Sequence, residues 1–312
     1  MEHQYNIEKM IGNIEKLIVG KREAIEYTLI TLLAGGHLLL EDVPGVGKTT
    51  LAKALAQTID CGFTRIQFTP DTLPSDVTGL SVYNMQTGKF EYSKGAIVNN
   101  IILADEINRT SPKTQASLLE AMEEKQITVD SITYPLSRPF MVIATQNPID
   151  YLGTYNLPEA QLDRFMIKIS IGYPSASDEQ VMADRFLNKQ LSEGLKPVVD
   201  GEAIIVMQQE VAEVKVNRDL ISFITKFIQA TRKDGNISLG ASPRATLALI
   251  RAAQARAYIF GRTYCIPDDI LELIVPVIAH RIILSPEARL AHTKEEKVLS
   301  NIISKLKIPV LN

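Results

Sequence analysis

The stretch LLLEDVPGVGKTTLAKALA, residues 38–56, joins an apolar run to a helix-like pattern through a loop that contains Pro44, Gly45 and Gly47. A strand that passes through such a loop into a helix is the context of a phosphate-binding loop. The glycines allow backbone N–H groups to curl around phosphate oxygens, and the start of the helix adds a partial positive charge. The alternative is an ordinary glycine-rich turn, which the spacing of the motif makes the weaker interpretation.

Two side chains after the loop are expected to complete a site for a nucleoside triphosphate. Lys48 reaches the β and γ phosphates, and the Thr49 hydroxyl ligates Mg2+. One position departs from the general pattern, because Asp42 stands where a glycine is usual. A carboxylate beside a polyphosphate is unfavourable, so we expect Asp42 to point away from it. The predicted nucleotide contacts are Pro44, Gly45, Val46, Gly47, Lys48, Thr49 and Thr50.

The composition limits the class of protein. With 312 residues and 46% apolar residues, the chain is long enough for about two domains with cores. Its 33 Lys and Arg are balanced by 36 Asp and Glu, which argues against a general nucleic-acid binder. Cys61, Cys265 and four scattered histidines give no metal-ligand or disulfide spacing. The sequence has no signal-peptide core and no run of 18 apolar residues, so we expect a cytoplasmic protein without a membrane span.

The pattern of apolar residues changes near Tyr173. Before it, short apolar runs alternate with helix-length segments, which is typical of a mostly parallel sheet covered by helices on both faces. After it the patterns are helical, and one apolar stripe consists of Leu220, Ile224, Phe227 and Ile228. The predicted strands lie at 37–42, 63–68, 99–106, 139–145 and 166–171. We predict an α/β core over 1–173, a linker over 174–200 and a smaller all-helical domain over 201–312.

Two segments interrupt the alternation within the predicted core. Residues 79–97 contain two β-prone stretches around 87–88, and residues 125–139 contain two around 130–131. Both are expected to form hairpins. Because loops on a rigid scaffold commonly carry binding contacts, these hairpins are candidate surfaces for a substrate.

An acidic pair ends the predicted strand at 99–106. Ligands gather at the carboxyl ends of parallel strands. Asp105 is therefore expected to hold Mg2+ through water, and Glu106 to polarise the water that attacks the γ-phosphate. Acidic pairs also serve as helix caps, but their position after a phosphate-binding loop favours catalysis.

Taken together, these motifs resemble the MoxR branch of the AAA+ ATPases. The similarity rests on GVGKTT (45–50), ILADEINRTSPKTQASLLEAMEE (102–124), IATQNP (143–148) and LPEAQLDRF (157–165), and it spans nearly the whole chain. The resemblance implies a P-loop AAA+ core with a five-stranded parallel sheet flanked by helices, and a helical lid. It also implies ATP hydrolysis with Mg2+, assembly into ring hexamers, and chaperone-like action, often beside partners with von Willebrand factor A domains.

The resemblance assigns roles to three more polar residues of the core. Asn147 becomes a sensor that orients the attacking water, although an Asn-Pro turn leaving the sheet also explains it. Arg164 becomes an arginine finger that reaches the nucleotide of a neighbouring subunit, although the dipole of a short helix begun near Pro158 would also favour a cation there. Arg109 could also face a neighbouring subunit.

The helical part contributes one more candidate. Ser242 and Pro243 predict an N-cap and a first helical position, which puts Arg244 in the first turn, where the helix dipole disfavours a cation. We therefore expect a negative group to compensate Arg244. The resemblance makes Arg244 the lid's second sensor, on the γ-phosphate, whereas the alternative is an exposed arginine without a role.

Adenine contacts are expected from the segment 17–21 ahead of the first strand. By resemblance, Ile18, Val19 and Gly20 contact the base, and core packing explains these residues equally well. The function that we expect is ATP-driven remodelling or maturation of partner protein complexes. A nucleotide-gated scaffold with slow hydrolysis is the alternative. A DNA-directed motor is disfavoured by the acidic balance, and a small-molecule kinase by the lack of an acceptor signature.

Overall fold

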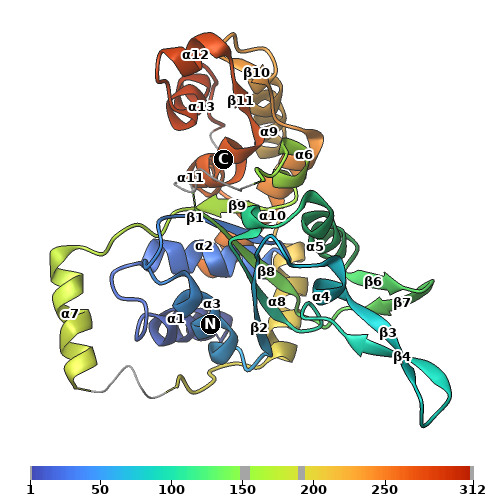
Figure 1. The fold of residues 1–312 in the computed structure, drawn as a ribbon. Helices are drawn as coiled ribbons and strands as arrows, with labels where there is room; N and C mark the ends of the chain where they lie inside the picture. Colours follow the sequence, from blue (N-terminus) through green and yellow to red (C-terminus); the bar gives the residue numbers. More distant parts are fainter. Residues whose placement is uncertain (1, 148–154, 189–193, 310–312) are drawn as a thin grey trace.

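The computed structural model describes residues 2–147, 155–188 and 194–309. A five-stranded parallel sheet lies at its centre, with the strand order β2-β5-β8-β1-β9 (Figure 1). All five strands expected from the sequence are confirmed, with bounds that shift by one or two residues. They are β1 (Leu38–Glu41), β2 (Phe63–Gln67), β5 (Ile101–Asp105), β8 (Met141–Gln146) and β9 (Ile167–Ile169).

Successive residues of these strands face two separate cores. Leu38 and Leu40 belong to one hydrophobic cluster, whereas Leu39 between them belongs to the other. Helices therefore cover both faces of the sheet, which explains why its strands are nearly continuous apolar runs. One cluster includes α1 (Glu2–Ile14), α2 (Arg22–Leu33), α3 (Lys48–Thr58), α8 (Gly201–Glu213) and α10 (Pro243–Ile259), and the other includes α4 (Pro74–Thr78) and α5 (Pro112–Glu124).

The lid continues the first of these clusters. The predicted stripe of Leu220, Ile224, Phe227 and Ile228 is buried, as expected. The prediction of a purely helical second part is wrong in one detail, because β10 (Ile237–Leu239) and β11 (Ile283–Leu284) pair as an antiparallel ribbon. Its other elements are α9 (Arg218–Thr231), α11 (Pro267–Ile278), η2 (Ala279–Arg281), α12 (Pro286–Leu290) and α13 (Glu295–Ser304).

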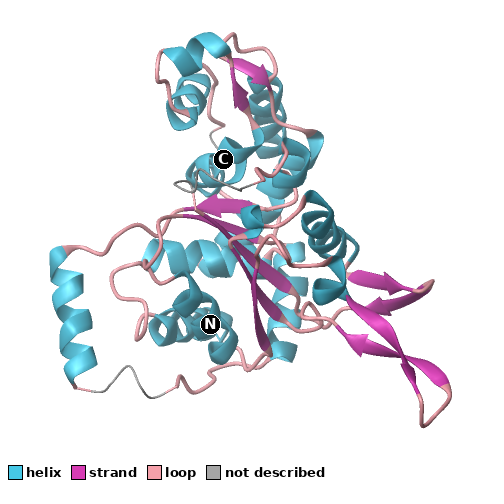
Figure 2. Cartoon of the chain, viewed as in Figure 1, coloured by secondary structure: helices cyan, strands magenta, loops and turns pink. Residues whose placement is uncertain are grey.

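Both predicted hairpins are present, and they extend away from the sheet as separate strand pairs (Figure 2). The first is formed by β3 (Gly79–Asn84) and β4 (Lys89–Lys94), and the second by β6 (Gln126–Val129) and β7 (Ile132–Pro135). Tyr92 and Tyr134 stack between them, with ring centroids 4.3 Å apart. Two apolar side chains at the tip of the first hairpin are exposed, since Met85 is 90% and Phe90 is 73% accessible.

The remaining connections contain η1 (Ile107–Arg109), α6 (Glu159–Leu162) and α7 (Ala176–Leu187). Helix α7 lies within the predicted linker and stands apart from the sheet in Figure 1. The linker residues 189–193 are outside the described part. Helix α8 contacts α2, so residues predicted as lid also cover the core. Among the described residues, no helix combines the length and the apolar character that crossing a membrane requires.

Candidate nucleotide-binding site

The loop between β1 and α3 has the backbone shape expected for phosphate binding. Gly45 and Gly47 have φ values of 88° and 93°, in the left-handed region that glycine adopts without strain. Gly47 is the N-cap of α3, which begins at Lys48. The first N–H groups of a helix have no partner within it, so this helix start can bind an anion. A Cβ on Gly45 would meet nothing within 4 Å, so space beside the loop is open.

The loop opens into a cleft of about 360 Å³, here called the phosphate cleft. Side chains from the carboxyl ends of β2, β5 and β8 meet the loop there, as the parallel arrangement of the strands requires. Val46 instead packs against the hydrophobic cluster. The lining residues are Pro44, Gly45, Gly47, Lys48, Thr49, Thr50, Arg65, Gln67, Asp105, Glu106 and Asn147.

Lys48 folds back over the loop. Its Nζ donates a 2.7 Å hydrogen bond to the backbone oxygen of Asp42. Burial lowers the pKa of Lys48, against the opposing effect of the nearby carboxylates of Asp42, Asp105 and Glu106. A phosphate group in the cleft would offer this ammonium group a stronger, charged acceptor than a neutral carbonyl.

Asp42 points away from the cleft, as expected from its position in the motif. Its Oδ2 accepts hydrogen bonds from the N–H groups of Ile171 at 2.6 Å and Gly172 at 2.7 Å, and from the Ser170 hydroxyl at 3.0 Å. Its Oδ1 accepts from Val43 N at 3.0 Å. The carboxylate thus joins the phosphate-binding loop to the segment after β9.

Asp105 is held between two neighbouring strands. Thr145 Oγ1 of β8 donates to its Oδ1 at 2.6 Å, and Arg65 of β2 donates to its Oδ2 at 2.6 and 3.1 Å. Asp105 and Thr49 are oxygen donors lining one cleft, and such donors fit Mg2+. Within the described ranges, no cluster of three or more His, Cys, Asp or Glu side chains could hold another metal ion.

Glu106 has a left-handed backbone, with φ at 57°. Such a conformation is uncommon for a non-glycine residue and is concentrated at functional sites. Its N–H donates to Thr145 Oγ1 at 2.9 Å, so one hydroxyl contacts both residues of the acidic pair. Its carboxylate accepts from Gln67 at 3.0 Å and from Arg109 at 2.7 Å. Arg109, which could have faced a neighbouring subunit, therefore forms an ion pair with Glu106 of its own chain.

Sequence reasoning missed two residues that line the cleft, Arg65 and Gln67, and one buried residue that supports it, Thr145. Arg65 and Gln67 alternate with apolar residues at the end of β2, and that polar alternation was the available signal. Thr145 gives no such signal, because its contact with Asp105 depends on β8 lying beside β5. Asn147 follows β8 directly and lines the cleft, as the prediction requires, while Pro148 is outside the described part.

The predicted adenine segment lies beside the loop. Ile18 is buried, and its Cδ1 lies 3.6 Å from the position of a Cβ on Gly47. Val19 is half-buried, and Gly20 is exposed and lies against Asp178 of α7. Ile18 is thus both a core residue and a neighbour of the loop, so its contact with adenine stays a prediction.

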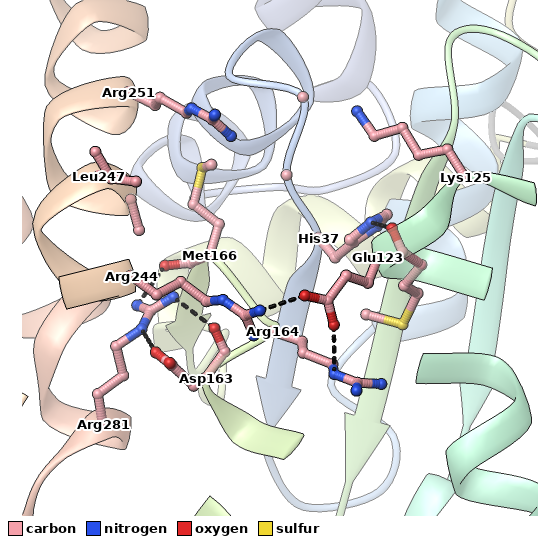
Figure 3. A pocket seen from close by; sticks show the side chains of 14 residues that line it. His37, Glu123, Lys125, Asp163, Arg164, Met166, Arg244, Leu247, Arg251 and Arg281 are labelled. Atoms are coloured by element: carbon pink, nitrogen blue, oxygen red, sulfur yellow. Dashed lines mark hydrogen bonds and ion pairs between the residues drawn. The ribbon is translucent and has the colours of Figure 1, made fainter. Parts of the chain in front are cut away.

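Arg164 and Arg244 lie together, but not at the phosphate cleft. Both line a second cavity of about 290 Å³, here called the arginine pocket, which also includes Gly36, His37 and Glu123 (Figure 3). Gly36 and His37 precede β1, so this pocket lies at the amino end of a strand whose carboxyl end leads into the phosphate-binding loop.

Glu123, at the end of α5, contacts both arginines. Arg164 forms an ion pair with it, with Nε 3.1 Å from Oε2, and Arg244 Nη2 donates a hydrogen bond to its Oε1. The negative group expected near Arg244 is therefore Glu123. Ser242 caps α10 and Pro243 is its first residue, both as predicted. Of the predicted catalytic and metal-binding residues, Lys48, Asp105, Glu106 and Asn147 all line the phosphate cleft. Arg164 and Arg244 do not line this cleft.

A phosphate-binding loop at the carboxyl edge of a parallel sheet, beside an acidic pair and under a helical lid, defines a nucleotide-binding protein of the AAA class. Residues 37–167 match the model of the ATPase family associated with various cellular activities (AAA), and residues 229–302 match that of the AAA lid domain.

Individual proteins narrow the class. The chain is 37% identical to Chaperone MoxR1 of Mycobacterium tuberculosis, over 99% of this chain and 84% of that protein. It is 49% identical to the uncharacterised protein YeaC of Bacillus subtilis, over 99% and 98% of the two chains. A crystal structure from Cytophaga hutchinsonii, described as that of a candidate ATPase, superposes with a TM-score of 0.92 at 39% identity, covering 99% of this chain and 96% of that one. The chain belongs to the MoxR family of AAA+ ATPases.

Proposed function

We propose that this protein hydrolyses ATP at a site completed by a second copy of the chain, and that the cycle remodels or matures partner protein complexes. One observation carries the proposal. Lys48 and Glu106 share the phosphate cleft, whereas Arg164 and Arg244 lie together in a separate pocket at the opposite end of β1.

Two different surfaces that complement each other favour a ring. When the arginine pocket of one subunit faces the phosphate cleft of the next, the contact is head-to-tail, and such contacts form a ring when the rotation from one subunit to the next closes. We propose a hexamer, following the family. In this arrangement Arg244 acts beside Arg164 on the neighbour's γ-phosphate. The expected role of Arg244 as a sensor of the γ-phosphate is thereby assigned to the nucleotide of the neighbouring subunit.

The residues of the cleft then have distinct tasks. Lys48 exchanges the Asp42 carbonyl for the β and γ phosphates, and Asn147 orients the attacking water. The Glu106 carboxylate gives up its contacts with Gln67 and Arg109 and accepts a proton from that water. The water oxygen then attacks the γ-phosphorus while the bond from this phosphorus to the β–γ bridging oxygen breaks. Mg2+, held by Thr49 and Asp105, would neutralise charge on the phosphates. The neighbour's arginines stabilise the charge of the transition state.

The exposed hairpins are the proposed contacts for a client. Apolar side chains at a protein surface favour binding to another protein, and Met85 and Phe90 are among the most exposed of this chain. A protein with a von Willebrand factor A domain is the proposed kind of partner, and no nucleic acid is expected. Because the activity consumes ATP, we propose that the protein works in the cytoplasm.

The proposal is tested by mixing two inactive chains. Lys48→Ala removes the phosphate contact and keeps the arginines, whereas Arg164→Ala does the reverse. Each should be inactive alone, and an equal mixture should recover activity, because about a quarter of randomly formed interfaces pair an intact cleft with an intact pocket. A co-assembled mixture that stays inactive would exclude the shared site.

A second measurement addresses the client. The Glu106→Gln chain with ATP should retain its client in a pull-down, since hydrolysis is blocked in the ATP-bound state. Client-stimulated turnover of the wild type supports remodelling, whereas slow turnover that a bound client leaves unchanged supports the gated scaffold. A wild-type chain without Mg2+-dependent ATP hydrolysis would overturn the proposed activity.

A further inference from the structure

The arginine pocket contains its own anion. Each oxygen of the Glu123 carboxylate forms an ion pair with a different arginine, Arg164 or Arg244 (Figure 3). These two guanidinium groups come from segments far apart in the sequence and converge on one carboxylate. A terminal phosphate group would require the same convergence, because it offers several oxygens around one centre.

These ion pairs are exposed enough to be exchanged. The accessible fractions of the side chains are 36% for Glu123, 28% for Arg164 and 46% for Arg244. Ion pairs with this degree of exposure are weak, because water competes for both charges. A γ-phosphate, which carries more charge and more acceptor oxygens than a carboxylate, can therefore displace Glu123.

The pocket remains attractive to an anion while Glu123 occupies it. Lys125 and Arg251 also line it, and neither forms an ion pair with any described residue. Burial and the nearby cations Arg138 and Arg251 lower the pKa of Lys125, as expected where positive charges lack a counter-ion. The fifth cation of the pocket, Arg281, is neutralised by Asp163 at 2.7 Å.

We propose that Glu123 is a positioning residue that substitutes for the neighbour's γ-phosphate in the free subunit: it holds Arg164 and Arg244 together and is displaced when the neighbour's ATP enters the pocket. This inference rests on the proposed function of the two arginines. Glu123 then raises the protein concentration at which subunits activate one another, because the ion pairs of Glu123 with the two arginines must break before the neighbour's ATP can enter.

The first test follows ATPase activity as a function of protein concentration. Glu123→Gln keeps the size of the side chain and removes its charge, so the half-activating protein concentration should fall about three- to tenfold, as expected for the loss of two weak ion pairs. Glu124→Gln is the matched control, because this exposed neighbour on α5 forms no ion pair with a described residue, and it should behave like the wild type. A higher half-activating concentration in Glu123→Gln would overturn the proposal.

The second test does not depend on hydrolysis or assembly. In dilute Lys48→Ala protein, where the phosphate cleft is disabled, inorganic tripolyphosphate should bind about three- to tenfold more tightly after Glu123→Gln. Adding Arg164→Ala and Arg244→Ala should abolish that binding. An unchanged affinity, or no binding to the Glu123→Gln chain, would overturn the exchange. If the tripolyphosphate result holds but the wild type lacks ATPase activity, the proposed function fails and the exchange at Glu123 stands.

Discussion

Asp42 Oδ2 accepts a 2.6 Å hydrogen bond from the backbone N–H of Ile171, which connects the start of the phosphate-binding loop to the segment that follows the edge strand β9. The departure from the usual glycine thus has a structural role, because the carboxylate accepts four hydrogen bonds outside the phosphate cleft.

Asp42→Asn should therefore destabilise the fold. An amide cannot accept all of these bonds, and its NH2 group would face backbone donors, so we expect a loss of about 1–3 kcal/mol in the free energy of unfolding. Glu41→Gln is the control, because its ion pair with Lys168 is partly exposed to solvent and contributes about 1 kcal/mol or less. Thermal unfolding measures both, and equal losses would contradict the role given to Asp42.

Arg164→Ala should reduce turnover without affecting the isolated site. Removing an arginine finger costs roughly 10³- to 10⁵-fold in rate, so assembly-dependent ATPase activity should be lost while a single chain binds ATP as before. Arg244→Ala should act in the same direction. Arg289→Ala, at an exposed position of the lid, is the control and should change stability by about 0.5 kcal/mol or less. Unchanged turnover in Arg164→Ala would refute its assignment.

Arg65→Ala should make Mg2+ easier to bind together with ATP. In the structure Arg65 donates a hydrogen bond to Asp105 Oδ2, and this bond must break before that oxygen can take part in binding Mg2+. Because a half-exposed ion pair contributes about 1 kcal/mol or less, the Mg2+ concentration for half-maximal ATP binding should fall up to about fivefold. Arg218→Ala on α9 should have no effect. A higher Mg2+ requirement would mean that Arg65 supports the phosphates instead.

Acid should destabilise the fold through His37. Burial lowers the pKa of His37 to about 4, and the neutral ring accepts a hydrogen bond from Val142 N at 3.0 Å. The unfolded chain, with a pKa near 6.5, binds a proton before the folded chain does. Stability is therefore complete above about pH 6.5 and falls by about 3 kcal/mol between there and pH 4.

The variant His37→Gln should weaken this pH dependence, although its stability at neutral pH will be lower. The buried His280 remains and contributes in the same direction, because burial also lowers its pKa. His292→Gln, at an exposed position, is the control and should keep the wild-type slope. The free energy of unfolding of each variant is measured between about pH 4 and pH 6.5. If His37→Gln lost as much stability on acidification as the wild type, His37 would not be the group responsible.

The hairpin tip should matter for the client and not for folding. Met85→Ser and Phe90→Ser remove apolar groups that are already exposed, so stability should change by about 0.5 kcal/mol or less. In the Glu106→Gln background with ATP, both should reduce the amount of client retained. Leu290→Ser, which alters a leucine of the lid that is 82% exposed, should retain the client fully. Equal retention by all three variants would exclude the hairpin as the client surface.

Much of the candidate site could be predicted from local patterns. The five strands, both hairpins, the glycines of the loop and the pair Asp105 and Glu106 were predictable, because strand alternation, turn residues and motif spacing act over a few neighbouring residues. The short ribbon β10–β11 was missed, since strands of three and two residues carry almost no periodic signal.

The sequence by itself therefore determined the class of fold and the groups that are predicted to contact a phosphate. The tertiary structure alone decided which strands are neighbours, and with them the contacts of Arg65 and Thr145 with Asp105. It also decided that Arg164 and Arg244 lie with Glu123 at the amino end of β1, away from the phosphate cleft. Such contacts depend on long-range packing of both cores, which no local pattern of residues encodes.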